Sequence, residues 1–179
     1  TVAMAATSIA GEKEARTWPL LLGTTLDDWQ IIRGKALAVL WRNLPLWLAM
    51  IVGHIAFFIS INLSLRGGGP GGPSFYWLYV LGGVLTFASH VVLLISVGMY
   101  FSVRLRSATA AVISSIGAVL GVFMFQRFFW MLIVRVLTVS MGSPYAGIIP
   151  FYLVPSLVYV GAGMFLIWRA KCRLRKDIF

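Results

Sequence analysis

Hydrophobic residues occupy long, nearly unbroken runs along most of this chain, and short polar segments separate the runs. A run of about 17–25 apolar residues is long enough to cross a bilayer as an α-helix. Because a helix satisfies its own backbone hydrogen bonds, which lipid cannot do, we expect each run to be helical. The pattern predicts an all-α membrane protein, a polytopic helix bundle within residues 36–179 whose four full spans cover about 44–63, 75–103, 108–125 and 151–168.

Two of the runs contain residues that are expected to change their course. Pro45 lies inside the first run and predicts a kink there. The third run extends to residue 140, which is more than one crossing requires, so we divide it at Gln126-Arg127. Residues 126–140 are then expected to form a separate interfacial or re-entrant helix on the outer side. In the part before this division, Gly117 and Gly121 form a G-x-x-x-G pattern that allows close helix approach.

The beginning of the chain has a different pattern. Residues 1–11 are small and apolar but too few to cross a bilayer. We expect them to be the end of an earlier membrane helix that begins upstream of Thr1. Residues 12–35 follow as a long polar segment with four of the five acidic residues.

The second half of this polar segment predicts a short amphipathic helix. Thr25 and Asp28 have the spacing of a capping box, in which each side chain satisfies a free backbone N–H group of the first turn. Two hypotheses for the helix stay open. It is either an interfacial element on the inner face of the membrane or a docking element for a soluble partner. The apolar residues that recur at helical spacing are Leu26, Trp29, Ile31 and Ile32.

Composition supports the membrane class, and charge gives the orientation. Sixty per cent of the residues are hydrophobic and 11% are charged, and the mean hydropathy is +0.91, whereas soluble domains carry about 25% charged residues. The net charge of +10 comes from basic residues between the apolar runs, so topology explains it better than nucleic acid does. With residues 12–35 and the tail 169–179 on the cytoplasmic side of the cell (inner) membrane, all but three Lys and Arg are inside. The three are Arg66, Arg127 and Arg135.

No catalytic motif stands out in this chain. Phosphate-loop, G-x-S-x-G and H-E-x-x-H patterns are missing from the sequence, and no acidic pair lies in a predicted span. Cys172 is the one cysteine, so the sequence predicts neither a disulfide framework nor a four-ligand zinc site. His54 and His90 fall at similar depth in neighbouring antiparallel spans, which leaves a bis-histidine haem-binding electron carrier open. A membrane assembly scaffold without transport is a further alternative.

The polar segment resembles the cytoplasmic loop of the type-2 permease family of ATP-binding-cassette exporters. That family has an acidic-basic-acidic pattern, a small gap, Gly-Thr, a leucine-rich run, Thr-Pro-Leu, an Ile/Val pair and Gly-Lys. Three positions depart from the pattern: Arg16 stands where the family usually has Gly, Pro19 where Glu is common, and Thr25 in place of Pro. The matching residues are Glu12, Lys13, Glu14, Thr17, Leu20, Leu21, Leu22, Thr24, Leu26, Ile31, Ile32, Gly34 and Lys35.

The resemblance extends along the chain and implies a function. Residues 104–111 resemble the family's basic inner turn, Ser143-Pro-Tyr145 its outer turn, and the basic end its tail. The chain would then be the C-terminal portion of a permease subunit, without enzymatic activity, cofactor or metal of its own. A separate subunit would bind ATP and magnesium, and a second permease half, identical or not, would complete the transport path.

The resemblance also implies roles for individual residues. The amphipathic helix would be a coupling helix that rests in a groove of the ATPase subunit. Arg127 and Arg135 would form an outer gate or contact lipid, with simple extension of both side chains to the head groups as the alternative. The implied contact residues of the ATPase subunit are Thr17, Leu20, Leu21, Leu22, Thr24, Leu26, Asp27, Asp28 and Trp29.

Overall fold

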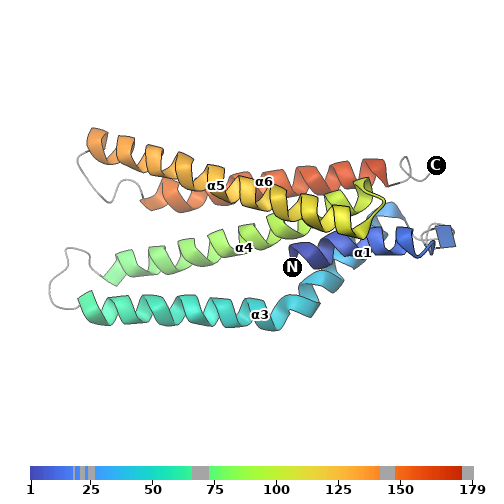
Figure 1. The fold of residues 1–179 in the computed structure, drawn as a ribbon. Coiled ribbons are helices and arrows are strands. Elements are labelled where there is room, and N and C mark those ends of the chain that lie inside the picture. Colours follow the sequence, from blue (N-terminus) through green and yellow to red (C-terminus); the bar gives the residue numbers. More distant parts are fainter. Residues whose placement is uncertain (18, 21–22, 24–26, 66–72, 142–147, 175–179) are drawn as a thin grey trace.

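The fold consists of long helices that run side by side (Figure 1). The computed structural model describes residues 1–17, 19–20, 23, 27–65, 73–141 and 148–174. The all-α prediction is confirmed for this part of the chain, which contains no strand. Four of its helices, α3 to α6, contain a segment long and apolar enough to cross a membrane, as in a multi-pass membrane protein. The helices are α1 (Val2–Glu14), α3 (Asp28–Leu65), α4 (Pro73–Arg104), α5 (Ala108–Met141) and α6 (Ile148–Arg173).

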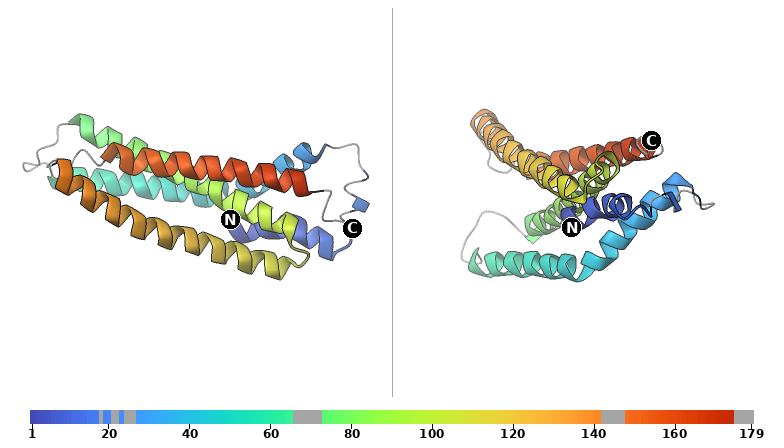
Figure 2. Two further views of the ribbon diagram at one scale, coloured as in Figure 1. Left: turned by 90° about the horizontal axis from the view of Figure 1, so that it is seen from above. Right: turned by 45° about the vertical axis from the view of Figure 1, so that its right-hand side comes forward.

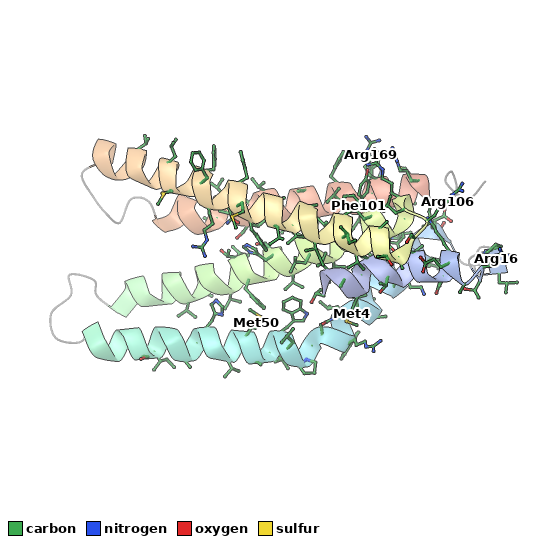
Figure 3. All side chains as sticks on the ribbon, in the orientation of Figure 1. Met4, Arg16, Met50, Phe101, Arg106 and Arg169 are labelled. Atoms are coloured by element: carbon green, nitrogen blue, oxygen red, sulfur yellow. The ribbon has the colours of Figure 1, made fainter. Side chains whose placement is uncertain are left out.

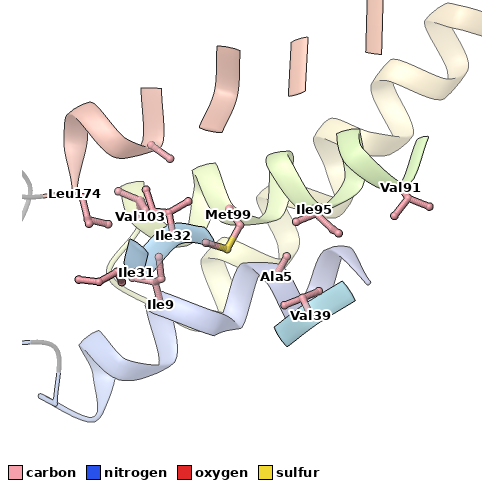
Figure 4. Packing of buried hydrophobic residues seen from close by; sticks show 11 residues of the cluster. Ala5, Ile9, Ile31, Ile32, Val39, Val91, Ile95, Met99, Val103 and Leu174 are labelled. Carbon is pink, nitrogen blue, oxygen red and sulfur yellow. The ribbon is translucent and has the colours of Figure 1, made fainter. Parts of the chain in front are cut away.

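Helix α4 lies at the centre of the bundle (Figure 2). It packs against α1, α3, α5 and α6. Five consecutive residues of α4, 95–99, are buried, so every face of the helix is covered over this stretch. The largest apolar cluster joins four helices near the end of the bundle where α1 lies (Figure 4). Its buried members are Ala5, Ile9, Ile31, Ile32, Val39, Val91, Ile95, Met99, Val103, Ala170 and Leu174.

Helix α1 approaches α4 so closely at Gly98 that no side chain fits at this position. A Cβ atom on Gly98 would lie 2.5 Å from the Cβ of Ala5 and 2.7 Å from the carbonyl oxygen of Val2. The hydroxyl oxygen of the buried Ser102 accepts hydrogen bonds from the N–H groups of Ile9 and Ala10, both at 2.9 Å. This contact therefore combines close packing with polar contacts, as is typical of helix pairs in membranes.

The predicted G-x-x-x-G pattern does not mark a close contact within the described bundle. Both Gly117 and Gly121 are exposed, and a Cβ on either would meet no atom within 4 Å. A second close approach instead involves Gly163 of α6, where a Cβ would lie 3.0 Å from side-chain atoms of Val92 and Ser96.

The outer part of α5 differs from the prediction. Helix α5 continues without interruption from Ala108 to Met141, so residues 126–140 do not form a separate interfacial or re-entrant helix. The physical reason is that glutamine and arginine are good helix formers, and the sequence around Gln126-Arg127 contains no proline or glycine that would end a helix. The excess length of this run was evidence for a long helix and not for two helices.

Helix α1 ends later than the sequence predicts, and α3 contains the proline for which a kink is predicted. Helix α1 continues to Glu14, three residues beyond the predicted end of the first segment. Helix α3 bends in its first half (Figure 1), and Pro45 lies inside it, which is an ordinary cause of a helix kink. The bend lets the start of α3 pack at the α1 end of the bundle, where Ile31, Ile32 and Val39 enter the core.

Candidate functional site at the polar end of the bundle

Most of the charged side chains that the structure describes gather at one end of the bundle, where α1, α4 and α6 end and α3 and α5 begin. Figure 3 shows Arg16, Arg106 and Arg169 at this end, although they come from three distant parts of the sequence. We call it the polar end. It contains residues 12–17 at the end of α1 and residues 27–35 at the start of α3, which belong to the polar segment of the sequence.

Three consecutive charged residues at the end of α1 contact three different helices. Glu12 forms a salt bridge with Lys35 of α3. Lys13 donates a hydrogen bond to the carbonyl oxygen of Val103 in the last turn of α4. Glu14 Oε1 accepts a hydrogen bond of 2.7 Å from the N–H group of Ala108, the first residue of α5. We call Glu12, Lys13 and Glu14 the charged clasp.

The signs of the charges in the clasp match the helix ends that they contact. The last carbonyl groups of a helix lack partners within it and carry a partial negative charge, which favours the ammonium group of Lys13. The first N–H groups carry a partial positive charge, which favours the carboxylate of Glu14. The acidic-basic-acidic order thus stabilises both sides of the α4–α5 turn and, through Glu12, the start of α3.

The end of α1 has the hydrogen bonds of a Schellman motif. The N–H of Thr17 donates to the carbonyl oxygen of Glu12 at 3.0 Å, and the N–H of Arg16 donates to that of Lys13 at 3.2 Å. Arg16 adopts φ = 57°, in the left-handed region where glycine is preferred. This geometry gives a physical reason for the glycine that the resembled pattern has at this position.

Replacing Arg16 with glycine should therefore stabilise the protein. We expect a gain of about 1 kcal/mol in the free energy of unfolding, because a non-glycine residue in the left-handed region costs about 1–2 kcal/mol. Reversible unfolding in mixed detergent micelles measures this difference. Ala15 has φ = −72° and is the matched control. If Ala15→Gly stabilises as much as Arg16→Gly, the backbone explanation is wrong.

Helix α3 begins with a capping box two residues later than predicted. The carboxylate of Asp27 accepts a hydrogen bond from the N–H of Trp29 at 3.4 Å, and Gln30 Oε1 accepts one from the N–H of Asp27 at 3.1 Å. Thr25 lies outside the described residues. The described part of the predicted amphipathic helix belongs to α3, which runs without a break from Asp28 to Leu65 and so continues directly into the first span.

The structure describes five of the nine predicted contact residues. Leu20 and Trp29 are 76% and 38% exposed, and Thr17 and Asp27 are exposed as well. Asp28 is half-buried. The other four, Leu21, Leu22, Thr24 and Leu26, lie outside the described residues.

The aliphatic pair of the resembled pattern has a structural role in this chain. Ile31 and Ile32 are buried in the main cluster, so they hold the start of α3 against the bundle. Their side chains are therefore not available to a partner. The side chain of Trp29, in the first turn of the same helix, is exposed and available.

The two predicted outer residues lie far from the polar end. Arg127 is exposed on α5, 19 residues beyond Ala108 and therefore roughly 28 Å from the start of the helix at 1.5 Å per residue. The side chain of Arg135 lies outside the described part, although its backbone belongs to α5. The roles of both as gate or lipid contacts stay predictions.

The two histidines line one cavity of about 720 Å³ that opens among α1, α3, α4 and α5. Nδ1 of His54 lies 2.9 Å from the carbonyl oxygen of Met50, and Nδ1 of His90 lies 2.6 Å from that of Thr86. The ring of His90 also packs against Tyr159, with ring centres 4.7 Å apart. The remaining lining is mainly apolar.

Sequence reasoning did not find the charged clasp or its partners. The acidic-basic-acidic order is visible in the sequence as a pattern. Only the fold shows that Val103 lies within hydrogen-bond distance of Lys13 and Ala108 within that of Glu14. Ser102 and Gly98 had no distinguishing signal in the sequence, because small residues are common throughout the apolar runs.

Comparisons with known proteins add no identification. No protein-family model, curated protein or solved structure matches the chain. Among the described residues, no group of three or more His, Cys, Asp or Glu side chains could hold a metal ion.

Proposed function

We propose that this chain is a membrane-spanning permease subunit of an ATP-binding-cassette exporter. The observation that carries the proposal is the charged clasp, which links the polar loop region to the ends of α3, α4 and α5. In this proposal α3 to α6 form one wall of the transport path. ATP is bound and hydrolysed by a separate subunit on the cytoplasmic side, and a second permease half completes the path.

The contacts at the polar end suit the transmission of movement. A capped helix that continues directly into a span can carry a displacement into that span, and in α3 the bend near Pro45 lies between the capped start and the rest of the helix. The exposed Leu20 and Trp29 offer apolar contacts, and Asp27 offers a charge at their edge. ATP-driven closure of the partner subunits would push on these residues and shift the bundle between inward-facing and outward-facing states.

Charge reversal at the start of α3 tests this proposal. The variant Asp27→Lys/Asp28→Lys should reduce co-purification of an ATP-binding subunit from native membranes by about tenfold or more, since like-charge contacts across an interface cost several kcal/mol. The measurement is the ratio of ATP-binding subunit to tagged permease after affinity purification. The helical content of the variant, measured by circular dichroism, should stay unchanged.

Two control variants separate the interface effect from a folding effect. Asp27→Asn keeps a good helix cap without the charge, so it reports the loss of charge alone. Thr109→Lys places a lysine in the first turn of α5 at the same end of the bundle but outside the proposed contact. If the double reversal leaves co-purification unchanged, or if Thr109→Lys lowers it equally, the proposed contact is wrong.

One observation favours a second candidate, a haem-binding electron carrier. His54 and His90 line the same cavity, and each contacts a backbone carbonyl oxygen through Nδ1, which is the usual arrangement of a histidine that ligates through Nε2. Such a protein would have a Soret band that disappears in His54→Ala or His90→Ala. If the protein is purified from cells supplied with sufficient haem and shows no Soret band, the haem-binding candidate is ruled out.

A further inference from the structure

A groove of about 290 Å³ opens among α3, α4 and α6 close to the polar end. Its walls are almost entirely apolar and come from all three helices. Arg33 is the one charged residue among those that line it. The apolar lining includes Leu37 and Leu40 of α3, Val92 and Ile95 of α4, and Ile167 of α6.

Arg33 is suited to bind an anion from outside the described chain. Its side chain is exposed, and no ion pair with it is found in the part of the chain that the structure describes. The guanidinium carbon lies 5.8 Å from the ring centre of Trp29, four residues earlier, so the ring helps to hold it in position. A guanidinium group matches phosphate geometry with two parallel hydrogen bonds.

The place of Arg33 along α3 is where contact with lipid head groups is expected. Arg33 is in the second turn of α3, five residues after Asp28, the first residue of the candidate span Asp28–Ala56. Leu37 and Leu40 follow it further along the helix, toward the apolar part, and Leu37 is 50% exposed. The exposed basic residues Arg169 and Lys171 lie on α6 at the same end of the bundle, and such groups attract anionic lipid to this region.

We infer that this groove binds one anionic phospholipid, with its phosphate on Arg33 and an acyl chain along the apolar walls. The inference does not depend on coupling to an ATPase. A free phosphate would leave the apolar walls uncovered. A two-fold contact with a second copy would bring two Arg33 side chains and their basic neighbours together, because such an interface presents the same patch from both subunits. An anionic lipid complements both the charge and the apolar surface.

Native mass spectrometry of the purified full chain in detergent tests the inference. The probes are phosphatidylglycerol and phosphatidylcholine with identical acyl chains, supplied in equal amounts. We expect one phosphatidylglycerol to be retained in preference to phosphatidylcholine. Arg33→Gln should lower this preference roughly tenfold, which is the loss expected for one charge-assisted contact.

Arg42→Gln is the matched control. Arg42 is exposed on the same helix, and it lies nine residues, or about two and a half turns, beyond Arg33, so it projects from the opposite face and does not line the groove. Its removal should leave the lipid preference unchanged. Leu37→Trp, which fills the groove, should lower the retention of both lipids.

Three results would overturn the inference. The first is equal retention of both lipids by the unaltered chain. The second is an equal effect of Arg33→Gln and Arg42→Gln, which would indicate a general surface charge and no site. The third is a dimer that retains no lipid and that Leu37→Trp dissociates, because a second copy would then cover the groove. None of these results bears on co-purification of an ATP-binding subunit.

Discussion

Gly98→Ala is expected to destabilise the bundle by about 1–3 kcal/mol, although it adds a single methyl group. The added Cβ would lie 2.5 Å from the Cβ of Ala5, 2.7 Å from the carbonyl oxygen of Val2 and 3.0 Å from the backbone nitrogen of Ala6. These atoms belong to a helix backbone or are directly attached to it, so no side chain can rotate away. Helix α1 has to move away from α4, which weakens the hydrogen bonds of Ser102 to the α1 backbone.

Gly117→Ala is the matched control for this substitution. Gly117 is also a helical glycine in an apolar run, but a Cβ there meets no atom within 4 Å. We expect this variant to be neutral or more stable by roughly 0.5–1 kcal/mol, because alanine favours the helix over glycine. Reversible unfolding in mixed detergent micelles gives both values. Equal effects of the two variants would show that α1 and α4 are not in close contact.

A charge swap across the clasp is the second prediction with a large effect. Glu12→Lys should lower the free energy of unfolding by about 1–2 kcal/mol. The side chains of Glu12 and Lys35 are each 27% exposed, so the loss should be larger than for a fully exposed ion pair and smaller than for a fully buried one. The single change also places three ammonium groups at the junction of α1 and α3. Lys35→Glu alone should cost a similar amount.

The double variant Glu12→Lys/Lys35→Glu should recover most of the lost stability, because the pair is restored with opposite polarity. The same unfolding measurement on the four proteins gives the coupling energy of the pair. In the proposed transporter the single variants should also lower the ATP hydrolysis that depends on the permease, and the swap should restore it. A double variant as unstable as the sum of its parts would mean that Glu12 and Lys35 do not interact.

The sequence was sufficient to predict which segments are helical. Apolar runs of bilayer length have few alternatives to a helix, so α3 to α6 were predictable from hydrophobicity alone. The exception was the division of α5 at Gln126-Arg127. Polarity indicates where a segment lies relative to lipid, but only backbone preferences indicate where a helix ends, and these favour continuation there.

The candidate site was only partly predictable. The resemblance directed attention to residues 12–35, where the matched pattern includes Ile31 and Ile32 and the implied contact residues include Leu20 and Trp29. The fold separates these residues into a buried pair and an exposed pair. The difference between a packing residue and a contact residue depends on which face of α3 meets the bundle, and that depends on partners far away in the sequence, such as Val103 and Leu174.

Site-specific cross-linking tests the central proposal most directly. In a variant whose exposed native cysteine is removed by Cys172→Ser, the substitution Leu20→Cys introduces a single thiol at the polar end. The account predicts that this thiol forms a cross-link to an ATP-binding subunit in native membranes, and that the thiol of Thr109→Cys in the same background does not. Labelling of Leu20→Cys by an impermeant reagent from the outer side of intact cells, with no cross-link to such a subunit, would contradict it.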